Sequence, residues 1–166
     1  MKWISLFFIL VTFACCKGDE FDLENPDAAQ FVALIKNGTY SKKAGNRLPH
    51  FTMNHIQQLS PYLNDTTEIT SFPTNPISSK YTSPKILNEC IMWVIEGIRM
   101  DETYPSLEPC LVNINFNSQT DHFRLTKKQL ISISIKYLQW HEEYLSNPNE
   151  ITRKRDVIDA SNFRWN

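Results

Sequence analysis

Few of the side chains that could carry out chemistry stand at a spacing that defines a site. His141, Glu142 and Glu143 could bind a metal ion or transfer protons. A metalloprotease helix, however, needs a second histidine four residues after the first, and Leu145 occupies that position. The sequence therefore predicts no metal site, no cofactor and no catalytic residue.

The other histidines and the serines give no stronger signal. His50 and His55 flank an expected helix start, where we interpret them as capping or surface residues. No serine stands in a glycine-flanked nucleophile elbow, and the four glycines of the chain form no phosphate-binding loop. The enzyme hypothesis that remains is an envelope hydrolase whose carboxylates converge only in the fold, for example Glu89, Glu96 or Glu142.

Two cysteines in the body of the chain, Cys90 and Cys110, lie twenty residues apart. In an exported protein such a pair is a candidate disulfide. Cys90 stands among isoleucines, where a free cysteine behaves as a small apolar residue, so simple burial is the favoured interpretation. A reactive thiol needs an accessible, electropositive setting, which these neighbours do not provide.

Asp65-Thr66-Thr67 resembles the short acceptor sequence for O-linked glycans on exported proteins of Bacteroides-type bacteria. This interpretation makes Thr66 a candidate glycosylation site on the surface. The alternative, which we favour, is a turn in which the Asp65 or threonine side chain bonds to the nearby backbone.

The N-terminus has the pattern of a lipoprotein signal peptide, which we assign to residues 1–15. Lys2 precedes a predominantly apolar run that is too short to span a bilayer. A small residue followed by cysteine resembles a bacterial lipobox, so we expect cleavage before Cys15 or Cys16 and a lipid on that cysteine. Cys15 follows Ala14 and is the better steric match. Residues 16–24 then form an acidic, flexible tether.

Residues 17–20, Lys-Gly-Asp-Glu, look like the export signal of surface lipoproteins in Bacteroides-type bacteria. We therefore expect an outer-membrane lipoprotein at the cell surface, with the periplasmic face as the alternative. The expected partners are the membrane, through the N-terminal lipid, and envelope proteins, glycans or peptides. Without Lys2 the chain has 16 basic and 18 acidic side chains, a balance that argues against nucleic acid as a partner.

The residues after the tether, 25–166, are enough for one domain with a single core. Their patterns predict a mainly α, compact and irregular helical domain of four to six helices with one small β-hairpin at about residues 111–125. Helical spacing and caps predict a first helix that starts at Asn25-Pro26 and ends at Gly38. A second, short helix follows a Thr52 cap and ends or kinks at Pro61.

The most apolar helix is expected to start at Pro84, with Ser83 as its cap, and to end near Arg99. Polar residues form only a narrow stripe on it, so it must be buried. Thr126 and Gln129 form a capping box that opens a long last helix ending near Ser146. The aromatic residues of the tail, Phe163 and Trp165, are expected to dock onto the domain.

Several segments, taken in order, resemble a family of Bacteroides-type lipoproteins described only as a domain of unknown function. These segments are FVALIKNGTY, LPHFT, LNDTTEITSFPTNPISS, LNECIMWVIEGIR, YPSL and YLQWHEE. The run from Asp65 to Ser79 is the most specific of them. The resemblance implies export and a mainly helical domain, and it implies no activity, cofactor or site residue.

These observations together favour a cell-envelope lipoprotein that acts as a binding or assembly component of a surface or periplasmic complex. The alternative of a different class is the carboxylate-based envelope hydrolase. Two facing carboxylates in a deep pocket would favour the hydrolase, whereas a shallow aromatic patch that includes Trp165 or Tyr144, without perturbed acids, would favour binding. A purely structural role is the third possibility, and it would show neither pocket nor patch.

Overall fold

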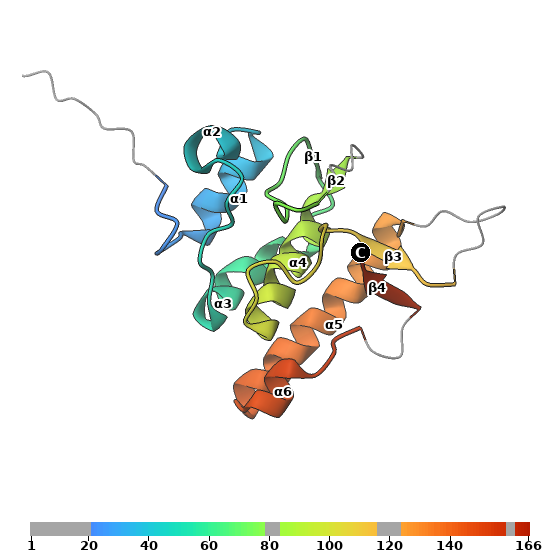
Figure 1. Cartoon of the computed structure of the whole chain (residues 1–166). Helices are drawn as coiled ribbons and strands as arrows, with labels where there is room; N and C mark the ends of the chain where they lie inside the picture. Colours follow the sequence, from blue (N-terminus) through green and yellow to red (C-terminus); the bar gives the residue numbers. More distant parts are fainter. Residues whose placement is uncertain (1–20, 79–83, 116–123, 159–161) are drawn as a thin grey trace, which may run out of the picture.

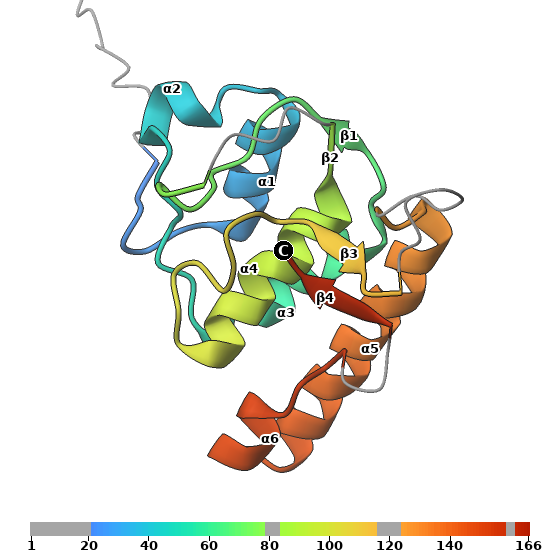
Figure 2. The same cartoon turned by 45° about the vertical axis from the view of Figure 1, so that its right-hand side comes forward.

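The fold is organised around one buried helix, α4 (Leu87–Met100), which lies in the middle of the computed structural model (Figures 1 and 2). The structure describes residues 21–78, 84–115, 124–158 and 162–166. Every residue of α4 from Leu87 to Arg99 is buried, as its apolar composition predicts. The mainly α prediction is confirmed, because six α-helices and two small antiparallel sheets make up the regular structure of the described residues.

The start of α4 differs from the sequence prediction. Pro84 does not open the helix, because Lys85–Ile86 forms strand β2, which pairs with β1 (Glu68–Ile69). The helix begins at Leu87, and its predicted cap, Ser83, lies outside the described residues. Backbone carbonyls replace a side-chain cap, since the N–H of Leu87 donates to Thr67 (2.9 Å) and that of Asn88 to Asp65 (2.9 Å).

The other end of α4 is a tight turn against the helix itself. Asp101 adopts a left-handed conformation (φ 61°), which asparagine and aspartate tolerate better than most residues. The backbone N–H of Glu102 then donates to the carbonyl of Gly97 at 2.9 Å. A Cβ atom at Gly97 would lie only 2.5 Å from the Glu102 carbonyl oxygen, so this turn requires glycine there.

The helices α1 (Ala28–Lys36) and α2 (Tyr40–Ala44) are joined by an aromatic cluster that includes Phe31, Tyr40 and Phe51. The first helix starts later than its sequence suggests, because Asp27, and not Asn25, accepts the capping bond from Gln30. It ends at Lys36, and Gly38 adopts the left-handed conformation that its position predicts.

The short helical segment between α2 and α4 consists of η1 (Met53–His55), α3 (Ile56–Leu59) and η2 (Ser60–Asn64). The α-helical part ends where Ser60-Pro61 predicts, and a 3₁₀ turn continues the chain because proline cannot supply the α-helical N–H. The turn η2 packs against both α4 and α5 (Lys127–Ser146).

The predicted capping box of α5 is present: the Gln129 side chain accepts from the Thr126 N–H, and the Thr126 hydroxyl accepts from the Gln129 N–H. The helix ends at Ser146 as expected, and α6 (Glu150–Lys154) follows after an Asn149 cap. Figures 1 and 2 show α5 at one edge of the molecule, on the side of α4 away from α1. No helix in the described part of the chain has the length and apolarity needed to cross a membrane.

Strand β3 (Leu111–Asn113) belongs to the predicted hairpin, and an antiparallel bridge joins Val112 to Arg124. Residues 116–123, which would complete this hairpin, lie outside the described residues. The longer ladder of β3 runs to β4 (Phe163–Trp165), with Leu111 opposite Trp165. The C-terminal aromatic residues therefore dock by strand pairing, which their spacing alone does not predict.

Candidate functional site

The narrow polar stripe of α4 is buried, and its carboxylates bind to distant parts of the chain. Burial of a charge is costly unless the charge is paired and hydrogen-bonded. Glu89 and Glu96 lie seven residues apart on this stripe and belong to two separate networks. Both networks position side chains that the sequence analysis named as candidates.

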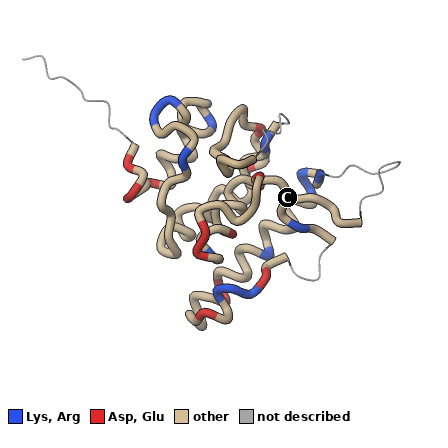
Figure 3. Tube along the Cα trace, viewed as in Figure 1, with Lys and Arg blue, Asp and Glu red and all other residues tan. Residues whose placement is uncertain are grey.

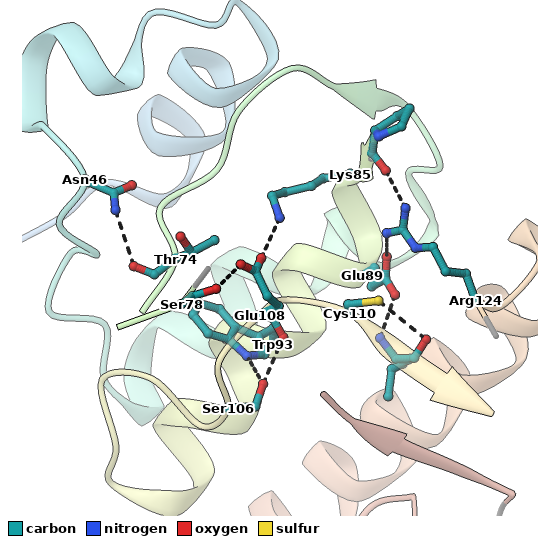
Figure 4. Close-up of polar contacts among 12 residues, drawn as sticks. Asn46, Thr74, Ser78, Lys85, Glu89, Trp93, Ser106, Glu108, Cys110 and Arg124 are labelled. Atoms are coloured by element: carbon teal, nitrogen blue, oxygen red, sulfur yellow. Dashed lines mark hydrogen bonds and ion pairs between the residues drawn. The ribbon is translucent and has the colours of Figure 1, made fainter. Parts of the chain in front are cut away.

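Glu89 is 2% exposed and holds β3 against α4 (Figure 4). Its carboxylate accepts from the backbone N–H of Leu111 at 2.7 Å and from the Arg124 guanidinium at 3.3 Å. Arg124 also donates to the carbonyl of Pro84 at 2.8 Å. Burial raises the pKa of Glu89 to about 7, because these partners offset only part of the cost of desolvating the charge.

Glu89 lines a hollow of about 310 Å³, which we call the Glu89 hollow. Arg124, Lys127 and a second carboxylate, Glu68, also line it, with Pro84 and Ile86 among the apolar neighbours. Glu68 is exposed on β1 and pairs with Lys127 at 3.3 Å. The hollow thus brings together one buried and one exposed carboxylate.

A second buried carboxylate, Glu108, binds the loop before α4 (Figure 4). It accepts from the Lys85 ammonium at 2.9 Å and from the hydroxyl of Ser78. Nearby, the Trp93 indole N–H donates to Ser106, whose hydroxyl donates to the Glu108 carbonyl at 2.9 Å. This cluster fastens three chain segments onto the face of α4 and leaves Glu108 fully paired.

Glu96 belongs to a network at the other end of α4. Its two oxygens accept from the Arg99 guanidinium at 2.5 and 3.1 Å, and one also accepts from the Tyr137 hydroxyl at 2.9 Å. The Trp165 indole N–H donates to the same hydroxyl at 3.1 Å. Burial raises the pKa of Tyr137 well above its usual value, so this phenol stays protonated and acts as a donor.

The third candidate carboxylate, Glu142, is exposed on α5. Glu89, Glu96 and Glu142 therefore lie in three different surroundings and do not meet in one pocket. The carboxylate that lines the same hollow as Glu89 is Glu68, which no pattern in the sequence marks as a candidate. Only the pairing of β1 with β2, a contact between segments distant in sequence, brings Glu68 beside the start of α4.

None of the candidate cysteines or the candidate threonine in the described residues forms an exposed reactive site. Cys90 and Cys110 are both buried free thiols, and burial raises the pKa of each. Thr66 is half-buried next to a turn in which Asp65 accepts from the N–H and hydroxyl of Thr67. The candidate lipid anchors, Cys15 and Cys16, lie outside the described residues.

The histidines have three different settings. His55 accepts from the backbone N–H of Thr52 at 2.9 Å and is part of a cap. His141 is largely buried, and burial lowers its pKa. His50 is exposed and lines the groove described next. Within the described ranges, no cluster of three histidine, cysteine or acidic residues is placed to hold a metal ion.

The surface is hollowed beside the C-terminal end of α4. We call this depression the N-terminal groove, because Leu23 and Glu24, near the start of the described chain, line it. It has a volume of about 290 Å³ and borders a second hollow of about 250 Å³ that shares His50, Ile98 and Asp101 with it. Its buried or partly buried lining residues are apolar and include Leu48, Phe51, Val94 and Ile98. Its exposed lining residues are charged or polar and include Glu24, Arg47, His50, Asp101 and Glu102.

Acidic residues lie on two sides of the N-terminal groove. Figure 3 shows them at the start of the described chain, where Glu24 lies, and at the turn after α4, where Asp101 and Glu102 lie. Asp101 is held by Arg153 of α6 at 2.8 Å. Among the described residues, Glu24 and Glu102 form no ion pair, so their carboxylates remain available to a ligand. The Tyr104-Pro105 break predicts a loop here, but no sequence signal predicts the groove.

A comparison with models of protein families matches residues 22–166 to a domain of unknown function, DUF4943. No curated protein and no solved structure is significantly similar to the chain. The family match includes every element of the fold, from the residues before α1 to the end of β4. The chain therefore belongs to the family defined by the domain of unknown function DUF4943.

Proposed function

We propose that this protein is a lipid-anchored binding component of the bacterial cell envelope, and that the N-terminal groove holds a short segment of a partner protein or peptide. The groove itself carries the proposal, since it combines an apolar floor with a charged rim. Binding sites are typically concave and mostly apolar, with a few polar groups that fix orientation. The expected ligand is an apolar side chain next to a basic residue, because unpaired acidic groups stand on the rim.

The anchor is proposed from the N-terminal sequence, in which an apolar run ends at Ala14 before Cys15 and Cys16. The Bacteroides-type association, the outer membrane and the cell surface are proposed because residues 17–20, Lys-Gly-Asp-Glu, look like the export signal of surface lipoproteins, with the periplasmic face as the alternative. Protease treatment of intact cells that express the full chain tests this placement. Digestion from outside that is lost in Cys15→Ala or in Cys16→Ala supports a surface lipoprotein. Protection with the anchor intact supports the periplasmic alternative.

A library of labelled nine-residue peptides with four random central positions tests the groove. We expect the full chain to enrich peptides in which an apolar residue neighbours lysine or arginine. The double variant Glu24→Lys/Glu102→Lys should abolish this enrichment, because it reverses the two acidic charges on the rim that form no ion pair among the described residues. Glu68→Lys is the control, since Glu68 is also an exposed acid and does not line the groove. Enrichment of acidic peptides, or equal enrichment by both variants, would contradict the proposal.

One observation favours a second candidate, the envelope hydrolase: Glu89 and Glu68 line the same hollow. A buried acid whose pKa is near 7 could donate a proton to a leaving group while an exposed carboxylate acts as base or nucleophile. A panel of fluorogenic glycosides tests this candidate. Hydrolysis that is lost in both Glu89→Gln and Glu68→Gln would support it, and turnover that persists in either variant would exclude this pair.

A further inference from the structure

One face of α5 carries exposed apolar residues at a regular spacing, with a charged residue toward each end. Its residues are separated alternately by three and four positions, the spacing of a coiled-coil seam. Ile131 is 38% exposed, Ile135 is 47% exposed and Leu145 is 64% exposed, and Leu138 is half-buried between them. We call this face the α5 seam; it consists of Lys128, Ile131, Ile135, Leu138, Glu142 and Leu145.

The α5 seam carries two charged residues, one toward each end. Lys128 and Glu142 are both exposed, and neither forms an ion pair among the described residues. Their neighbours are already engaged, since Lys127 pairs with Glu68 and Glu143 pairs with Arg155. Glu142 stands fourteen positions after Lys128 on the helix, a distance of about 21 Å along the axis.

We propose that the α5 seam binds the same seam of a second copy of this chain in an antiparallel, two-fold symmetric dimer. In antiparallel packing, Ile135 of one copy lies opposite Leu138 of the other, and both copies contribute the same pair. Lys128 then lies opposite Leu145 of the second copy, about 4.5 Å along the axis from its Glu142. The long lysine side chain can span that distance, so each dimer contains two such pairs of opposite charges.

The charges on the α5 seam favour a second copy of the chain as the partner, and they favour the antiparallel orientation. A parallel pair would place Lys128 against Lys128 and Glu142 against Glu142, and like charges at an interface are unfavourable. The antiparallel arrangement places each of the two charges near its opposite. A helix face that is basic at one end and acidic at the other is complementary to itself, which a face built for a membrane or for an unrelated protein need not be.

Photo-crosslinking in intact cells tests the proposal with the full chain. The photoreactive amino acid p-benzoylphenylalanine replaces Ile135 in one version and Ile151 in another. Ile151 on α6 is the matched control, since it is an isoleucine that is 87% exposed and lies outside the seam. We expect light to produce an adduct of twice the chain mass from position 135, with at least five times the yield obtained from position 151.

Charge reversal makes the test specific for the antiparallel register. Lys128→Glu alone and Glu142→Lys alone should each reduce the adduct from position 135 at least fivefold, because like charges then meet. The double variant Lys128→Glu/Glu142→Lys should restore it, since the opposite charges meet again with their positions exchanged. Equal adducts from positions 135 and 151, an adduct only with a different protein, or no rescue in the double variant would overturn the proposal.

Discussion

Replacing Glu89 with glutamine should change how the stability of this protein depends on pH. The buried Glu89 carboxyl has its pKa raised from 4.5 to about 7, mainly because burial penalises its charged form. The folded state therefore holds this proton over a pH range in which the unfolded chain has released it. The free energy of unfolding must then fall as pH rises between 4.5 and 7, and the contribution of Glu89 is complete only below pH 4.5.

The size of this effect follows from the two pKa values. Each pH unit between 4.5 and about 7 is worth about 1.4 kcal/mol, so wild type should lose about 3 kcal/mol across the window relative to Glu89→Gln. Glutamine does not titrate, and its side-chain oxygen can still accept from the Leu111 N–H that Glu89 binds at 2.7 Å. The difference between the two proteins therefore isolates the proton on Glu89, because the other titrating groups are common to both.

Urea unfolding of wild type and Glu89→Gln at several pH values from 4.5 to 7.5 gives this difference directly. Glu24→Gln is the control for the removal of a carboxyl, since Glu24 is exposed and does not line the Glu89 hollow. Parallel curves for wild type and Glu89→Gln would refute the reasoning. They would mean that Leu111 and Arg124 compensate fully for burial, and the hydrolase candidate would lose its proton donor.

Three further substitutions test the packing around α4 and α5. Asn88 is 0% exposed, and both its side-chain polar atoms lack a hydrogen-bond partner in the structure. Asn88→Leu should therefore raise the free energy of unfolding, measured in urea, by about 1–3 kcal/mol. A loss of stability would show that the Asn88 amide is satisfied. Gly97→Ala should lower the free energy of unfolding by about 2 kcal/mol or more, because the new Cβ atom would lie 2.5 Å from the Glu102 carbonyl oxygen. An unchanged urea midpoint would contradict that contact. Thr126→Ala should lower the thermal midpoint by an amount equivalent to about 1 kcal/mol, since it removes the cap of α5; Thr126→Ser, which keeps the hydroxyl, should restore most of it.

Local patterns predict the parts of this fold that local interactions determine. The capping box at Thr126 and the stop after Ser146 depend on residues within one or two turns, and both are present. The predicted start of α4 at Pro84 was wrong, because a contact between distant residues determines where this helix begins. Ser83-Pro84 is a sound local signal, but residues 85–86 pair with residues 68–69, and this distant contact outweighs the signal.

The candidate sites depend almost entirely on distant contacts. Glu89 and Arg124 are 35 residues apart in sequence, and Lys85 and Glu108 are 23 apart. A buried carboxylate can be expected from an apolar helix with a narrow polar stripe, and α4 fulfils that expectation. The identity of the cation that compensates it cannot be read from the stripe, because loops of unknown path supply it. The N-terminal groove is unpredictable for the same reason, since its lining comes from three separate segments.

The two proposed surfaces should act independently, and this gives a final check on both. The N-terminal groove is built on the C-terminal end of α4, and the α5 seam consists mostly of exposed residues of α5, a helix that Figures 1 and 2 show on the side of α4 away from α1. Effects of substitutions at well-separated sites without shared partners are usually additive. Glu24→Lys/Glu102→Lys should therefore leave the crosslink from position 135 unchanged, and Lys128→Glu should leave peptide enrichment unchanged. If a substitution on one surface changed binding at the other, one structural element would have to contact both surfaces. The first candidate would be α6, because its Arg153 binds Asp101 on the groove and α6 also packs against α5.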